Sequence, residues 1–129
     1  MNEQWARSWC EAMSSGDTER ALAYYASNVE FEDVPFRMTA SGTDFGAVMD
    51  HFVGSGNNAF SFARFSGGSE GGAVESVWRA RHGDEFLGVK SAGKTTEVRL
   101  VTVLAFGETG LICRHCDYWD AREVLAQLR

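Results

Sequence analysis

The chain has 129 residues, 44% of them hydrophobic, which suits a single folded domain over residues 1–129. Its 12 lysines and arginines stand against 18 aspartates and glutamates, so the net charge of −6 argues against a nucleic-acid partner. No apolar run is long enough to span a membrane, and the charged N-terminus lacks the apolar centre of a signal peptide, so we expect a cytoplasmic protein that does not bind membranes.

Three cysteines are too few, and odd in number, for the disulfide framework of a secreted domain. Cys113 and Cys116 form a C-x-x-C motif, but they fall within a predicted strand, where residues three apart point to opposite faces. We therefore expect free thiols that pack as small apolar groups, with no metal site and no cofactor.

The first part of the chain is predicted to be helical. Apolar residues at helical spacing run from Trp5 to Met13, and Ser14-Ser15-Gly16 ends that helix. Asp17 is the expected N-cap of a second helix over residues 18–26.

The rest of the chain is predicted to be mainly strands. Alternating apolar and polar residues predict strands over residues 29–33, 60–65, 74–82, 95–106 and 111–119. Two more helices are expected, a short one after Thr43-Asp44 and a last one over residues 121–128. The order indicates an α+β fold, a cone-shaped barrel of strongly curved antiparallel sheet packed on N-terminal helices, with a short C-terminal helix.

Several short motifs resemble one superfamily. The opening of the chain resembles nuclear-transport-factor-2-like proteins, including ketosteroid isomerases, through Gly16-Asp17, Leu22, Tyr24-Tyr25-Ala26 and Val29-Glu30-Phe31-Glu32-Asp33. A middle segment is similar to the SnoaL-like polyketide cyclases, through His82-Gly83, Phe86-Leu87-Gly88 and Ala92-Gly93-Lys94. The final segment, residues 117–123, resembles both those cyclases and the limonene-epoxide-hydrolase branch. The resemblance implies the cone-shaped fold and a homodimer formed through the outer face of the sheet.

Asp33 is the first candidate for catalysis. It shares a strand face with Val29 and Phe31, so the register that buries those residues directs its carboxylate into the pocket. Aromatic surroundings would raise its pKa and suit a general base, the role that the resemblance to ketosteroid isomerases also implies. The alternative is a structural aspartate that caps the turn at Pro35.

Asp117 and His115 are the second candidates. They share one face of the last strand with Leu111, Cys113 and Trp119, and they are expected to lie about 6.5–7 Å apart along that strand. The resemblance to epoxide hydrolases implies that Asp117 is a catalytic acid, and His115 can exchange a proton near neutral pH. The alternative is a His–Asp pair that satisfies itself within the core.

Aromatic side chains are the candidates for binding a flat hydrophobic substrate, and they could equally belong to the core. These candidates are Trp9, Phe60, Phe62, Trp78 and Trp119. His82, at a hairpin end, is either a residue of the pocket rim or a solvated turn residue.

The sequence departs from two branches of the superfamily. Where epoxide hydrolases have an Arg and an Asp, this chain has Ser76 and Trp78. Where ketosteroid isomerases place their oxyanion hole, it has Trp9 and Thr102, which remain candidate substrate contacts.

We therefore expect an acid–base enzyme of the cyclase, isomerase or epoxide-opening type that acts, without cofactor, on a hydrophobic polycyclic, polyketide-like or terpenoid-like molecule. The alternative is a non-catalytic module that binds a hydrophobic ligand or mediates dimerisation.

Overall fold

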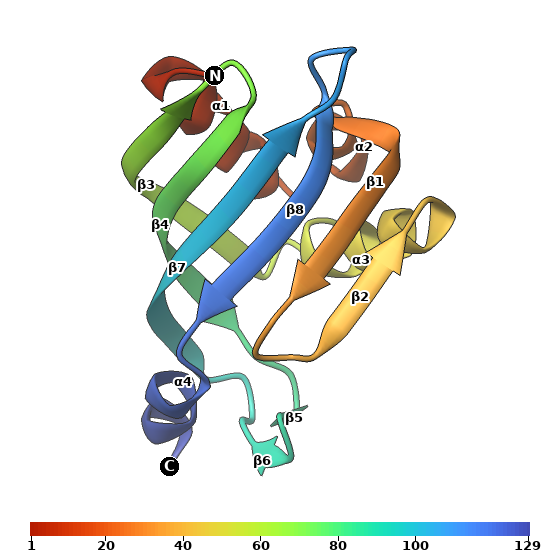
Figure 1. The fold of residues 1–129 in the computed structure, drawn as a ribbon. Helices are drawn as coiled ribbons and strands as arrows, with labels where there is room; N and C mark the ends of the chain where they lie inside the picture. The colour runs from red at the N-terminus through yellow and green to blue at the C-terminus, as the bar shows by residue number, and fades with distance from the viewer.

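The computed structural model describes residues 1–129 and shows one curved sheet with helices on one of its faces (Figure 1). The helices are α1 (Glu3–Met13), α2 (Thr18–Leu22), α3 (Thr43–Phe52) and α4 (Ala121–Leu128). The main-sheet strands are β1 (Tyr25–Asp33), β2 (Met38–Ser41), β3 (Asn58–Gly68), β4 (Gly71–Arg81), β7 (Thr95–Phe106) and β8 (Ile112–Trp119). A small hairpin pairs β5 (Glu85–Phe86) with β6 (Val89–Lys90). The predicted α+β architecture is confirmed.

The six strands follow the order β2-β1-β8-β7-β4-β3, and every pair is antiparallel except β1 with β8. This parallel pair places the first strand of the sheet beside the last one, so residues more than eighty positions apart share one face of the sheet. The sheet is curved but not closed, and β-bulges interrupt β1, β3 and the β7–β8 ladder.

Helices α1, α2 and α4 begin at a side-chain cap, whereas α3 begins after Gly42 without one. The Asn2 side chain accepts a hydrogen bond from Trp5 N at 2.9 Å at the start of α1, and Asp17 accepts one from Arg20 N at 3.1 Å at the start of α2. Helix α1 packs across β3, and α3 packs against β1 and β2. Figure 1 shows α4 at the end of the sheet near β5 and β6, away from the other helices.

Two clusters of buried side chains form the core. The larger one lies between the N-terminal helices and the sheet and includes Trp9, Phe31 and Phe45. The smaller one, around Trp78 and Trp119, is covered by α4. No helix of the chain is both long and apolar enough to cross a membrane.

The predicted second helix was too long. Helix α2 ends at Leu22, and the chain is already extended at Tyr25, which opens β1. Ile112 N donates to Tyr24 O at 2.9 Å, so pairing with β8 ties down the backbone here and overrides the local helical pattern.

The predicted inward face of the last strand was also wrong at its start. We expected Leu111 and Cys113 to face inward with His115, but Ile112 is fully buried whereas Leu111 is exposed. The cause is a bulge in β8: Ala105 pairs with Arg114 and Phe106 with Ile112, so Cys113 is an extra residue and the alternation changes there.

Candidate active site

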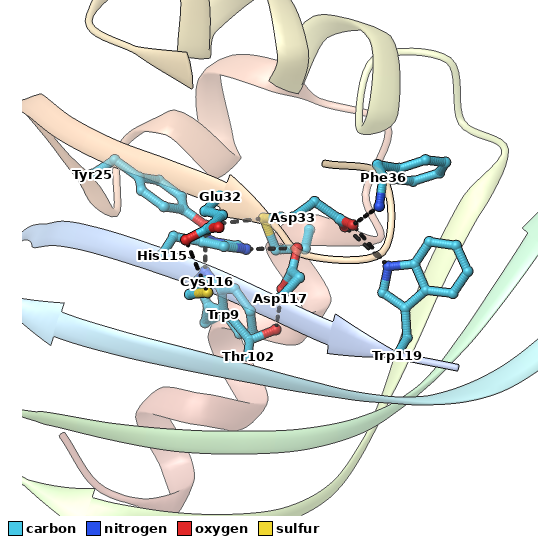
Figure 2. Close-up of polar contacts among 11 residues, drawn as sticks. Trp9, Tyr25, Glu32, Asp33, Phe36, Thr102, His115, Cys116, Asp117 and Trp119 are labelled. Carbon is cyan, nitrogen blue, oxygen red and sulfur yellow. Dashed lines mark hydrogen bonds and ion pairs between the residues drawn. The ribbon is translucent and has the colours of Figure 1, made fainter. Parts of the chain in front are cut away.

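Asp33 ends β1 on the buried face of the strand and is 6% exposed. The Trp119 indole N–H lies 3.0 and 3.1 Å from its two carboxylate oxygens, and Phe36 N donates to Oδ1 at 3.1 Å (Figure 2). Burial, followed by the nearby Asp117 carboxylate, raises the pKa of Asp33 to about 6, although the donors oppose this shift. Asp33 therefore caps its turn and also carries a carboxyl group tuned towards neutral pH.

Asp117 and His115 lie on the same face of β8. His115 is 2% exposed, and its Nε2 lies 2.9 Å from Asp117 Oδ2. This contact is not a regular hydrogen bond, because the ring N–H is not aligned with the carboxylate and Nε2 has no other partner. The Thr102 hydroxyl donates to Asp117 Oδ1 at 2.6 Å, so one carboxylate oxygen is held firmly by β7.

Tyr25 completes the cluster, although its sequence pattern did not predict a site residue. Its hydroxyl lies 2.9 Å from His115 Nδ1 and accepts a hydrogen bond from Trp9 Nε1 at 3.2 Å. Burial raises the pKa of Tyr25 well above its usual value, so the phenol keeps its proton. The alternation that starts at Val29 gave no signal for Tyr25, because the pairing with β8 shifts register between Tyr25 and Glu30.

The three candidate acid–base groups open onto one cavity, which lies where the two core clusters meet. Its apolar walls are Met13, Phe31, Phe36, Val48, Met49, Phe52, Phe60, Trp78 and Leu100, and its polar groups are Asp33, His115 and Asp117. The cavity is small, because only about 40 Å³ of it is open to the centre of a water molecule. The half-buried side chains of Phe36, Val48 and Phe52 mark where the cavity approaches the surface.

The structure divides the aromatic candidates. Phe60 and Trp78 line the cavity, whereas Trp9 lies in the core, donates to Tyr25 and has its ring centre 5.9 Å from that of His115. Trp119 acts on Asp33 through its indole N–H. Phe62 lies away from the cavity, with the Arg7 guanidinium 4.4 Å above its ring centre.

The two polar candidates for substrate contact do not line the cavity either. Thr102 is fully buried and holds Asp117. His82 lines a separate polar depression, with its Nε2 2.6 Å from Thr96 Oγ1 and its ring 4.3 Å from that of Phe86. Burial lowers the pKa of His82.

All three cysteines are free, and no cluster of three or more His, Cys, Asp or Glu side chains is arranged to hold a metal ion.

Solved structures share this fold at low sequence identity. A proposed SnoaL-like polyketide cyclase from Shewanella denitrificans OS-217 superposes with a TM-score of 0.80 at 18% identity, over 98% of this chain and 95% of the other. A proposed polyketide cyclase from Xanthomonas campestris pv. campestris gives 0.78 at 19% identity over 100% of both chains. IdmH, a proposed polyketide cyclase from Streptomyces antibioticus, gives 0.74 at 20% identity over 98% of this chain and 96% of the other.

At these identities the likeness concerns the fold alone. Among curated protein sequences, no match to the chain was found. The family described as SnoaL-like polyketide cyclase matches residues 3–128, which is nearly the whole sequence. The chain therefore belongs to the SnoaL-like polyketide cyclase family.

Proposed function

We propose that this protein is a cofactor-independent acid–base enzyme that acts on a hydrophobic polycyclic, polyketide-like or terpenoid-like molecule. The observation that carries the proposal is the convergence of Asp33, Asp117 and His115 on one cavity whose other nine lining residues are hydrophobic. A base and an acid that face the same apolar space are what proton transfer at a carbon atom requires.

The two carboxyl groups can divide the work. In ring closure, one carboxylate takes a proton from a carbon beside a carbonyl, and the resulting enolate carbon attacks a second carbonyl carbon. The new alkoxide oxygen then takes a proton from the other acid, so charge and protons balance. Asp117 with His115 forms one proton-transfer unit and Asp33 the other, and the same groups suit double-bond isomerisation or epoxide opening.

The cavity also restricts the substrate. Its lining contains no lysine or arginine, so the part of the substrate that enters it is uncharged rather than anionic. This free volume of about 40 Å³ is less than a two-ring molecule needs. Binding therefore requires Phe36 and Phe52 to move apart, which their half-buried positions allow.

Exchange of protons for deuterium in 2-tetralone tests this function without knowledge of the natural substrate. We expect the wild-type protein to accelerate exchange at the carbon beside the carbonyl, measured by proton NMR in D₂O. Asp117→Asn and Asp33→Asn should each slow that exchange by about 100-fold or more, because a general base contributes roughly 10²–10⁴-fold.

Asp84→Asn is the matched control, because Asp84 is exposed and lies beyond the end of β4. It should exchange at the wild-type rate, and circular dichroism should show all variants folded. Wild-type exchange rates in Asp117→Asn would remove Asp117 from the mechanism. A wild-type protein that binds 2-tetralone without accelerating exchange would instead support a binding role.

The non-catalytic alternative has one observation in its favour. Each carboxylate already has hydrogen-bond partners, as in a structural network. Trp119 and Phe36 donate to Asp33, and Thr102 donates to Asp117. A dimerisation role would use the outer face of the sheet, where Val103 and Tyr118 are exposed. We propose a homodimer through that face, which sedimentation velocity would test. We also propose a cytoplasmic location, which fits the three free cysteines.

A further inference from the structure

The hydroxyl group of Tyr25 contacts three side chains within the core, of which Figure 2 labels Trp9 and His115. It lies 3.2 Å from Trp9 Nε1, 3.7 Å from Met13 Sδ and 2.9 Å from His115 Nδ1. All four residues are at least nine-tenths buried, so no solvent competes for these contacts.

Counting protons fixes the direction of these contacts. The indole N–H of Trp9 can only donate, so it occupies one lone pair of the Tyr25 oxygen. The single phenol proton must then point to Met13 Sδ or to His115 Nδ1. The imidazole nitrogen is closer, and a thioether sulfur is only a weak acceptor. The proton of Tyr25 therefore lies between its oxygen and His115 Nδ1.

We propose that Tyr25 is a positioning residue which, by donating to Nδ1, holds neutral His115 as the tautomer protonated at Nε2, on the cavity side. The donors run in one direction, from Trp9 through Tyr25 to His115, whose Nε2–H then lies beside Asp117 Oδ2 without forming an aligned hydrogen bond. The use of this arrangement in proton transfer rests on the proposed function, but the arrangement itself does not.

The opposite tautomer is unfavourable at both ring nitrogens. With a proton on Nδ1, the Tyr25 oxygen would accept from both Trp9 and His115, and its own proton would be left to Met13 Sδ. At the other side of the ring, a bare Nε2 lone pair would face Asp117 Oδ2 at 2.9 Å. A lone pair on Nε2 is repelled by the carboxylate at that distance, whereas an N–H there is attracted to it even without ideal alignment.

The held tautomer also indicates what the cavity can bind. His115 Nε2 is buried and has no aligned hydrogen-bond partner, and a buried donor left unpaired costs about 1–3 kcal/mol. A ligand oxygen placed in the cavity can accept from this N–H. The site thus suits a molecule with a carbonyl or hydroxyl oxygen beside the carbon that exchanges its proton.

The test reads the tautomer of His115 by nitrogen-15 NMR in the free protein, so it needs no substrate. The chain has three histidines, and the His115 signals are those that disappear in His115→Gln. The Asp117 carboxylate also favours a proton on Nε2 of His115. Asp117→Ala removes that carboxylate, so Tyr25 alone is left to set the tautomer. We expect His115 to stay protonated at Nε2 in Asp117→Ala.

Adding Tyr25→Phe to Asp117→Ala should convert His115 to a mixture of both tautomers. Tyr24→Phe in the same background is the control, because Tyr24 packs edge-on against Trp5 and should leave the signals unchanged. A proton on Nδ1 in Asp117→Ala, or an unchanged pattern in the double variant, would overturn the proposal. Because turnover is not measured, an inactive enzyme would refute the proposed function and leave this result intact.

Discussion

Asp33 and Asp117 stand opposite each other in the parallel ladder between β1 and β8, and both carboxyl groups line the same cavity. Neighbouring strands of a sheet lie about 4.7–4.9 Å apart, so two acids in this register interact strongly once water is excluded. Their proximity is one of the two causes, after burial, that raise the pKa of Asp33 to about 6. The ladder thus creates a pair of acids with different environments, which is the arrangement that acid–base catalysis uses.

The raised pKa of Asp33 predicts a pH-dependent loss of stability. Between the ordinary aspartate pKa of 3.8 and the folded value of about 6, the folded protein keeps a proton that the unfolded chain has released. The free energy of unfolding should therefore fall as pH rises through this window, by about 3 kcal/mol from this residue alone. In Asp33→Asn this contribution should vanish, as measured by urea unfolding from about pH 4 to about pH 8.

Asp84→Asn serves as the control for this measurement, because that carboxylate is exposed. Its unfolding curve should follow the wild type at every pH. Parallel pH profiles for the wild type and Asp33→Asn would mean that the Asp33 carboxyl group titrates alike in the folded and unfolded chains.

Thr102 is expected to matter for activity because it fixes Asp117. Thr102→Val keeps the shape of a fully buried side chain and removes the hydroxyl that donates to Asp117 Oδ1 at 2.6 Å. We expect a loss of about 1.5–3 kcal/mol in stability, typical of a hydrogen bond to a charged group, and about tenfold slower exchange of 2-tetralone. Thr102→Ser should restore both, and a serine variant as impaired as the valine variant would point to packing instead.

A substitution that fills the cavity should block ligand binding without unfolding the protein. Val48 lies on the cavity side of α3, so Val48→Trp should place an indole in or across the entrance. We expect the affinity for 2-tetralone, measured by NMR titration, to fall by more than about tenfold, since about 1.4 kcal/mol of lost contact is enough. Ala47→Trp, on the exposed side of the same helix, should bind normally. Unchanged binding in Val48→Trp would place the ligand elsewhere.

Long elements with strong periodicity could be predicted from the sequence. The last long strands and the closing helix were expected at 95–106, 111–119 and 121–128, and the structure has them at Thr95–Phe106, Ile112–Trp119 and Ala121–Leu128. The alternation of Val29, Phe31 and Asp33 likewise indicated that the Asp33 carboxylate faces inward, which it does. In these segments the local pattern and the tertiary contacts favour the same structure.

Short elements and irregularities could not be predicted in this way. Tyr25 was assigned to a helix because its local sequence is compatible with one, whereas pairing beside Ile112 makes it the start of β1. The bulge at Cys113 of β8 leaves no trace in the alternation of residue types, so the predicted face was wrong there.

The sequence by itself determined the α+β architecture and the faces on which Asp33, His115 and Asp117 lie, because the period of a strand is a local property of the backbone. Only the tertiary structure decided that β1 and β8 are neighbours, that Asp33 therefore meets Asp117, and that Tyr25 reaches His115 Nδ1. Those contacts join residues some ninety positions apart, and they depend on strand order and register, which are set by how the whole core packs rather than by any one segment.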